Sequence, residues 1–207
     1  MKLRVLVASL TIVCSTFATA QKVLHKKLAQ FTQSLPQEYQ AISDDRKGEL
    51  MSLVDKIITQ RNLNGNAALV FSSNDNTSAS QMAQAWMQVA IEQYGLQNMM
   101  VSSFGATEKA IDKATIKSLK NAGFKVQSNA SFSPKPRYLV SYSWNTNPML
   151  MFSKKSDNFQ IPSTNVVTFA VEENSEANSD EMCRKVAREM FFVAEKIQTI
   201  HMLTLQP

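Results

Sequence analysis

The chain has 207 residues, with 22 basic and 17 acidic side chains and a formal net charge of +5 at pH 7. The charges are interspersed and form no long basic block, so composition gives no support for a nucleic-acid partner or for binding to a membrane surface. A chain of this length suits one domain with a sizeable core.

The first 20 residues have the pattern of a secretory signal peptide. Lys2 and Arg4 form a positive start, residues 6–13 are apolar, and Ala18-Thr19-Ala20 is a small-x-small cleavage signature. The apolar run is too short to span a bilayer. We therefore predict an exported protein, periplasmic or secreted, that is not inserted in a membrane after signal cleavage.

The cysteines fit this prediction. Cleavage after Ala20 leaves Cys183 as the single thiol of the mature chain, so no internal disulfide is expected. Lipoprotein processing at Cys14 is an alternative, but Val13 is larger than the residue that such processing normally needs. Cys183 lies on an apolar helical face, and we expect a buried core thiol there.

Hydrophobic periodicity predicts two regions after the signal peptide. Residues 21–65 form a helical extension, with helices at 22–35 and after Ser43. Residues 66–203 form an α/β domain with a mostly parallel sheet. Its expected strands are 67–71, 99–103, 124–127, 137–144 and 166–171, and its expected helices are 81–94, 107–122 and the segment from Ser179. Residues 145–164 are expected to form a long surface loop.

The stretch LVFSSNDNTSASQMAQAW, residues 69–86, is the candidate site. It predicts a buried strand, a polar loop and a helix start. Helix starts offer free N–H groups and a partial positive charge, and ligands of open α/β sheets bind beyond the carboxyl ends of strands. An ordinary polar connection explains the spacing equally well. The candidate binding loop consists of Ser73, Asn74, Asp75, Asn76, Thr77 and Ser78.

This stretch resembles the phosphate loop of the low-molecular-weight tyrosine phosphatase and arsenate reductase family. The helix start Ser80-Gln81-Met82-Ala83 matches, and Asn76 stands at the place of the family's loop Asn. Residues 94–126 are similar to the family's second strand, Ser-x-Gly turn and following helix. The ending DEMCRKVAREMFFV and the segment MFSKKSDN resemble a longer exported bacterial branch. The resemblance implies a three-layer sandwich with a four-stranded, mostly parallel sheet, to which the N-terminal helices are added.

The family's catalytic groups are replaced in this chain. By the resemblance, Ser73 stands where the nucleophilic Cys belongs and Ala79 where the oxyanion-binding Arg belongs. A hydroxyl without an adjacent base is a weak nucleophile. No Asp-Pro pair supplies the family's general acid. Glu172, Glu173 and Glu176 could substitute for it, although a solvated acidic turn explains them as well.

Asp75 adds a charge argument. A carboxylate about 5 Å from a bound anion would cost roughly 3 kcal/mol at an effective dielectric near 20. Because the loop has no Gly, left-handed residues are expected among Asn74, Asp75 and Asn76, which tolerate that conformation best. The loop is thus predicted to keep the shape of a phosphate cradle without its electrostatics.

Other candidate groups carry competing interpretations. Trp144, Asn145 and Asn147 could form a second wall of the pocket, or Trp144 could pack in the core. We expect His25 and His201 to lie on the surface. The eleven Met residues suggest core packing rather than copper handling. No metal site and no cofactor are expected.

The prediction for function is a catalytically degenerate, exported relative of this family that binds an unknown protein or a small neutral ligand. Three alternatives stay open. The first is an active phosphatase or arsenate reductase that works through Ser73. The second is a different hydrolase that uses Ser73 and Asp75, and the third is a purely structural role.

Overall fold

The computed structural model describes residues 23–128, 133–156, 165–171 and 179–204. The predicted signal peptide and the acidic residues Glu172, Glu173 and Glu176 lie outside these residues. Within the described ranges, no helix has both the length and the apolar composition needed to cross a membrane.

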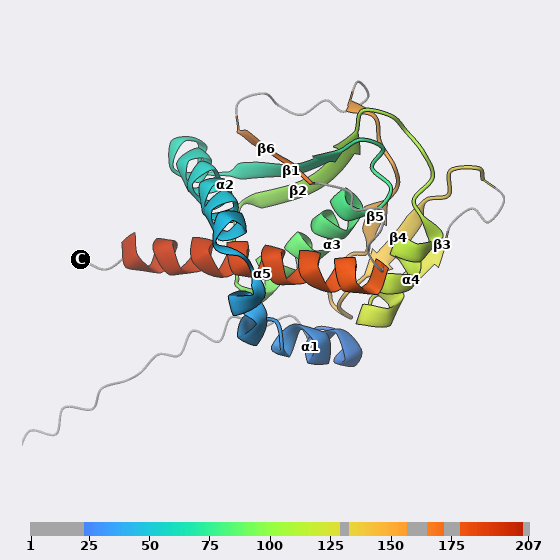
Figure 1. The fold of residues 1–207 in the computed structure, drawn as a ribbon, viewed down its shortest axis with the longest axis horizontal. Helices are drawn as coiled ribbons and strands as arrows, with labels where there is room; N and C mark the ends of the chain where they lie inside the picture. The colour runs from blue at the N-terminus through green and yellow to red at the C-terminus, as the bar shows by residue number, and fades with distance from the viewer. Residues whose placement is uncertain (1–22, 129–132, 157–164, 172–178, 205–207) are drawn as a thin grey trace, which may run out of the picture.

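Helices and strands alternate along most of the chain (Figure 1). The helices are α1 (Lys26–Gln33), the short 3-10 helix η1 (Pro36–Ala41), α2 (Asp44–Asn64), α3 (Ala79–Gln93), α4 (Lys113–Ala122) and α5 (Ser179–Thr204). The strands are β1 (Ala67–Ser73), β2 (Met99–Gly105), β3 (Lys125–Ser128), β4 (Tyr138–Ser141), β5 (Met149–Met151) and β6 (Val166–Ala170). The α/β class predicted from the sequence is confirmed.

The strands form two sheets instead of one four-stranded sheet. β1 lies between β2 and β6, and both pairings are parallel. β3, β4 and β5 form a separate antiparallel sheet. The expected four-stranded sheet is therefore not confirmed among the described residues. Segments 124–127 and 137–144 pair with each other, and their short strands keep only Val140 fully buried.

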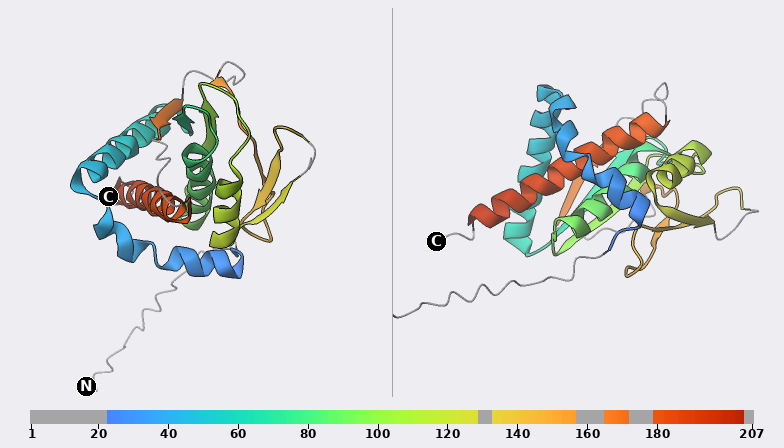
Figure 2. Two further views of the ribbon diagram at one scale, coloured as in Figure 1. Left: turned by 45° about the vertical axis from the view of Figure 1, so that its right-hand side comes forward. Right: turned by 90° about the horizontal axis from the view of Figure 1, so that it is seen from below.

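The helices gather on one face of the parallel sheet (Figure 2, left). On β1, Leu69 and Phe71 point into the core cluster formed with the helices, whereas Val70 does not belong to that cluster. On β6, Val167 is buried, whereas Thr168 on the opposite face is exposed. The second helical layer expected of a three-layer sandwich is absent from the described part of the chain, because the route from β5 to β6 contains no described helix.

An irregular segment after β5 runs along the outer edge of β2, where Lys155 forms a parallel bridge with Gly105 and the Gly105 N–H donates to the Lys154 carbonyl at 2.8 Å. The Lys154 Nζ donates to the Ser102 Oγ at 3.0 Å, and Ser102 is the register partner of Val70 on β1. Val70, on the face of β1 that points away from the helices, is nevertheless only 1% exposed. The buried strand predicted at residues 67–71 is confirmed, since all five of these residues are buried.

Helix α5 runs through the middle of the helical layer and contacts α2, α3, α4 and η1 (Figures 1 and 2). Its first half is tied to η1 and α2 by ion pairs: Glu189 accepts from Arg46 at 2.7 Å, and Arg184 pairs with Glu38. The residues before position 65 therefore pack directly on the last helix. The boundary predicted at residues 65/66 stays a prediction.

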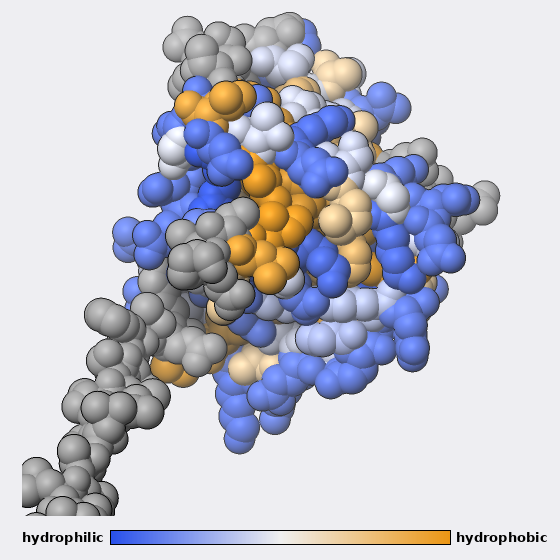
Figure 3. Space-filling model, turned by 90° about the vertical axis from the view of Figure 1, so that its left-hand side faces the viewer, coloured by the Kyte–Doolittle hydropathy of each residue, from blue (hydrophilic) through white to orange (hydrophobic). Residues whose placement is uncertain are grey.

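One end of the molecule exposes apolar side chains. Figure 3 shows an apolar area framed by hydrophilic residues on the face that lies at the left of Figure 1. Leu63 at the end of α2, Met100 on β2, and Met202 and Leu203 at the end of α5 are all more than half exposed. This area lies away from the loop between β1 and α3, because it belongs to the opposite end of the strands.

The end of α4 is packed tightly against α1. Gly123 follows the helix with a φ of +115°, and a Cβ added there would lie 2.4 Å from the backbone nitrogen of Leu28. Only Gly fits both the left-handed backbone and this close approach. The helix itself begins at Lys113 and not at Thr107 as predicted, because residues 106–112 fold back onto the loop after β1.

We predict opposite effects for two glycine substitutions. Gly123→Ala should lower the free energy of unfolding by about 2–4 kcal/mol, because the new methyl group collides with the backbone of α1. Gly48→Ala, in the interior of α2 with nothing within 4 Å of its added methyl group, should raise it by about 0.5–1 kcal/mol. Urea unfolding of both variants measures the difference. Equal effects would contradict the close packing of α1 on α4.

Candidate functional site

The loop between β1 and α3 is held against the segment that follows β2. The carbonyl oxygen of Asn74 accepts from the Thr107 N–H at 2.9 Å. Gly105 permits this approach, because a Cβ there would lie 2.8 Å from the backbone nitrogen of Asn76. The predicted binding residues from Ser73 to Ser78 are thus brought together in one turn at the carboxyl end of the sheet.

Asn76 is the centre of the loop. It has a φ of +55°, as expected for one of the three residues able to adopt a left-handed backbone, and its side chain is fully buried. Its N–H donates to the Ser73 Oγ at 3.1 Å, its Oδ1 accepts from the Ser80 Oγ at 2.9 Å, and its Nδ2 donates to the Ser103 carbonyl at 3.4 Å. These bonds fix the turn from the inside.

Ser73 belongs to the same network. Its Oγ lies 2.9 Å from the Ser80 Oγ. Because the Ser80 proton is directed to the Asn76 amide oxygen, Ser73 is the donor in this pair. An amide oxygen is not a proton acceptor of useful basicity, so the chain of hydroxyls ends without a general base. Both hydrogen bonds of the Ser73 hydroxyl thus stay within the loop and the start of α3.

The negative charge of Asp75 is balanced by a neighbouring lysine, which corrects part of the expectation that Asp75 would repel a bound anion. Its Oδ1 accepts from the Thr77 Oγ1 at 2.8 Å, and its Oδ2 lies 3.0 Å from the Lys109 Nζ. The carboxylate is 17% exposed. The predicted repulsion of a bound anion is therefore reduced by the neighbouring ammonium group. The Asp75 oxygens bond to Thr77 and Lys109, whereas Ser73 bonds to Asn76 and Ser80.

Ala79 begins α3 and is 1% exposed. Its methyl group offers no hydrogen bond to an oxyanion. Next to it, the Ser78 Oγ contacts the Met182 Sδ of α5 at 3.9 Å, and Ser78 is 9% exposed. This side of the loop is thus closed by a weak hydrogen bond from the Ser78 hydroxyl to a sulfur of the last helix.

The wall of the site comes from residues that sequence reasoning did not assign. The Gln81 Nε2 donates to the carbonyl oxygens of Asn76 at 3.2 Å and of Phe152 at 3.0 Å. The Ser153 Oγ donates to the Asp75 carbonyl at 3.0 Å. Gln81 was used only to recognise the helix start, and residues 152–153 lay inside the predicted surface loop. Strand β5, just before them, was also missed.

Trp144, Asn145 and Asn147 do not form this wall. Trp144 is 68% exposed, its ring lies 3.3 Å from the Lys125 Nζ, and it meets the ring of His25 edge to face. Neither the proposed pocket wall nor core packing describes it. Asn145 and Asn147 are exposed beside it. These three residues were predicted to line the pocket because they follow a strand. That strand, β4, belongs to the antiparallel sheet and not to the parallel sheet that carries the loop.

The remaining candidate groups have structural surroundings. His201 is exposed as predicted, whereas the prediction for His25 is wrong: it is 5% exposed, with its Nε2 3.1 Å from the Ser141 Oγ. Burial lowers the pKa of His25. Cys183 is buried as predicted, and burial raises the pKa of its thiol to about 12. In the described residues no cluster of three His, Cys, Asp or Glu could hold a metal ion.

A cleft of about 920 Å³ lies between α2, β6 and the first half of α5. Its arginines are engaged in ion pairs that join the helices: Arg46 with Glu49 and Glu189, and Arg184 with Glu38. The Arg46 guanidinium also lies 5.3 Å from the centre of the Phe169 ring. These ion pairs join α2 and η1 to α5, so the charges of both arginines are already balanced within the protein.

The family model for low molecular weight phosphotyrosine protein phosphatase matches residues 68–139. This region is about a third of the chain and contains β1, the loop, α3, β2 and α4. A search of curated proteins gave no match.

Several solved structures are similar at low identity. An arsenate reductase in the phosphate-binding state is 15% identical, and the match covers 65% of this chain and 98% of that one with a TM-score of 0.41. A low-molecular-weight phosphotyrosine phosphatase from Vibrio cholerae O395 is 14% identical, with coverages of 68% and 99% and a TM-score of 0.40. A thioredoxin-dependent arsenate reductase from Corynebacterium glutamicum is 14% identical, with coverages of 84% and 97% and a TM-score of 0.40. Values this low support no statement about activity.

Lys154 gives the site region a pH dependence. Burial of its ammonium group beside Ser102 lowers its pKa to about 8. Between this value and the ordinary pKa of 10.5, the unfolded chain binds more protons at this residue than the folded chain does. The buried ammonium group therefore destabilises the folded state most below pH 8. The free energy of unfolding increases as the pH rises from about 8 to 10.5.

We predict that the free energy of unfolding rises by about 1–2 kcal/mol between pH 7.5 and 9.5 through this group. Lys154→Met should remove the rise, because methionine has no proton to bind. Urea unfolding at several pH values measures both proteins. An identical pH profile in the variant would show that Lys154 is not buried as described.

Proposed function

We propose that this chain is a catalytically degenerate relative of low-molecular-weight tyrosine phosphatases and arsenate reductases. In this proposal the loop from Ser73 to Ser78 is a recognition element for a protein partner or a small neutral ligand. The observation that carries the proposal is the closed hydroxyl network of Ser73, Ser80 and Asn76, which ends on an amide oxygen.

The first support is the state of the nucleophile position. Catalysis by a hydroxyl needs a base that removes its proton, and the proton of Ser73 is directed to another hydroxyl. The family's thiolate has its pKa lowered by backbone N–H groups and a helix start. One such group, the Asn76 N–H, is present here, but an alcohol remains protonated in the same field.

The second support is the balance of charge around the loop. A phosphate or arsenate site needs an excess of positive charge aimed at the oxyanion. At the family's Arg position the chain has the buried methyl group of Ala79. Lys109, the cation bound to the loop, is paired with Asp75. A local balance near neutrality favours a neutral ligand or the polar surface of a protein.

Export to the periplasm or to the medium is part of the proposal. It rests on the pattern of residues 1–20 and on the absence of a second cysteine from the chain after Ala20. In such a compartment a single buried thiol with a raised pKa is protected from oxidation and exchange.

The proposal predicts that the mature protein, residues 21–207, does not hydrolyse p-nitrophenyl phosphate and does not reduce arsenate in the presence of a thiol donor. The Ser73→Ala variant should give the same background, because Ser73 performs no chemistry. Steady-state assays of wild type and variant, purified in parallel, test this. Turnover that is present in the wild type and lost in Ser73→Ala would establish the alternative, an active enzyme of the family class.

A structural role for Ser73 predicts a second result for the same variant. Ser73→Ala leaves the Asn76 N–H without its acceptor and Ser80 without a donor, so the free energy of unfolding should fall by about 1–2 kcal/mol. Ser52→Ala, at an exposed position of α2, is the matched control and should change stability by less than about 0.5 kcal/mol. Equal stability of both variants would remove the network as the reason for retaining this hydroxyl.

A further inference from the structure

A small basic pocket lies next to the loop, on the side of Asp75. Its cavity volume is about 240 Å³. We call it the Arg137 pocket, and its chemically important lining residues are Glu108, Lys109, Lys135, Arg137, Phe152 and Ser153. None of these residues takes part in the hydroxyl network around Ser73 and Asn76.

The charges of the Arg137 pocket do not cancel. Lys109 pairs with Asp75 at 3.0 Å, and Lys135 pairs with Glu108 at 3.3 Å. Among the described residues no carboxylate forms an ion pair with Arg137, which is exposed. One guanidinium thus remains uncompensated between two balanced pairs, and this leaves the pocket with a net positive field.

The guanidinium of Arg137 is held in place by an aromatic ring. Its central carbon lies 4.7 Å from the centre of the Phe152 ring, and the Lys154 Nζ lies 5.2 Å from the same ring. A guanidinium packed on a ring keeps its N–H groups available at its edge, where they can donate to two oxygens at once. Stacking therefore prepares Arg137 for a two-oxygen ligand before the ligand arrives.

The ring is in turn fixed by the loop. The Phe152 carbonyl accepts from the Gln81 Nε2 at 3.0 Å, and Gln81 also holds the carbonyl of Asn76. The adjacent Ser153 donates its hydroxyl to the Asp75 carbonyl. The Arg137 pocket and the closed loop are therefore two parts of one rigid surface at the carboxyl end of β1.

We propose that the Arg137 pocket binds the carboxylate of an acidic side chain on a polypeptide partner, while the neighbouring loop contacts neutral parts of the same partner. This inference rests on the proposed non-catalytic function and names the partner's chemistry. The cavity is smaller than the roughly 300–1,000 Å³ typical of sites for whole small molecules. It fits a single side-chain head, which a larger partner carries.

The charge balance of the pocket favours a singly charged group. Lys109 and Lys135 are already paired with Asp75 and Glu108, so the uncompensated charge of Arg137 is matched by a ligand with one negative charge. A planar carboxylate also matches the two donors at the edge of a guanidinium. A phosphate dianion is disfavoured on both grounds.

The test is binding of a dye-labelled hexaglutamate peptide to the mature protein at about 50 mM salt, followed by fluorescence anisotropy. Hexaglutamine is the neutral control peptide. Arg137→Gln should weaken binding of hexaglutamate by about tenfold or more, and Arg137→Lys should give an intermediate loss, because lysine keeps the charge without the two-donor edge. Hexaglutamine should not bind detectably.

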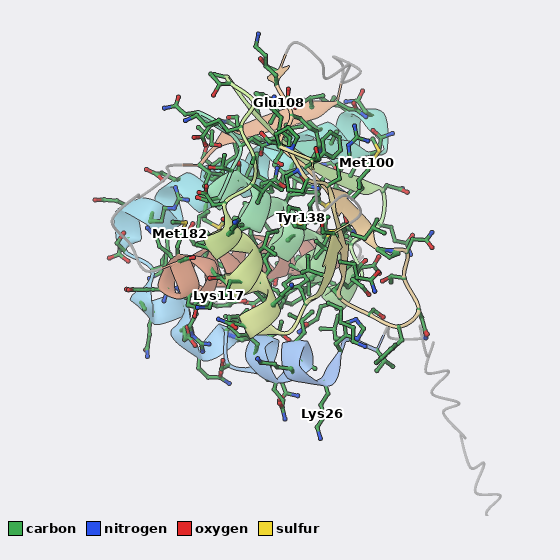
Figure 4. All side chains as sticks on the ribbon, turned by 90° about the vertical axis from the view of Figure 1, so that its right-hand side faces the viewer. Lys26, Met100, Glu108, Lys117, Tyr138 and Met182 are labelled. Atoms are coloured by element: carbon green, nitrogen blue, oxygen red, sulfur yellow. The ribbon has the colours of Figure 1, made fainter. Side chains whose placement is uncertain are left out.

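Lys26→Gln is the matched protein control, because it removes the same charge from an exposed site on α1. Figure 4 shows Lys26 and Glu108 at opposite ends of the molecule. This variant should change the affinity by less than about twofold. Equal weakening by Lys26→Gln and Arg137→Gln would overturn the assignment, since it would indicate attraction by net charge alone. Absence of wild-type binding at 1 mM peptide, on the order of the weakest useful affinity, would also overturn it.

Inorganic phosphate, added as a competitor at the same ionic strength, checks the chemical class. Displacement of hexaglutamate by phosphate more readily than by free glutarate would overturn the assignment to a carboxylate. The phosphatase and arsenate assays fail or succeed independently of these results. Turnover through Ser73 would reject the non-catalytic function. Unchanged hexaglutamate binding by Arg137→Gln would reject only the proposal of an acidic partner.

Discussion

The closed loop after β1 depends on the buried side chain of Asn76. Its backbone takes the left-handed conformation that the turn requires, its side-chain amide bonds to Ser103 on β2 and to Ser80 on α3, and its N–H donates to Ser73 on β1. A left-handed residue without these bonds would be strained, and a buried amide without partners would be costly. The same bonds that stabilise the turn occupy the hydroxyl of Ser73. The shape of the turn and the engagement of the Ser73 hydroxyl therefore have one cause.

The arrangement of the parallel sheet brings the loop after β1 and the Arg137 pocket to the same end of the molecule. Helices cover one face of the parallel sheet, and the segment around Lys154 runs along its edge beside β2. This segment also carries Phe152 and Ser153, which join the loop to the Arg137 pocket. A region without regular secondary structure thus supplies the link between the buried turn and the exposed charge. Its position is fixed by hydrogen bonds from elements that are themselves rigid.

The sequence was sufficient for the local features and insufficient for the long-range ones. The apolar run of β1, the cap at Ser43 and the left-handed position in the loop follow from local chemistry, and the structure agrees. The pairing of β3 with β4 depends on contacts between distant segments, which periodicity does not encode. For the same reason Lys109 could not be assigned to Asp75, nor Arg137 to Phe152, before the chain was folded.

The position of α5 has a consequence for the order in which the native state can form. This last helix fills the centre of the helical layer, and its Glu189 and Arg184 complete ion pairs whose partners lie about 140 residues earlier. A chain emerging from the ribosome consequently exposes the apolar sides of α2 and α3 until the final residues arrive. Contacts between such distant parts of the sequence raise the contact order, and folding through them is slow compared with folding through local contacts.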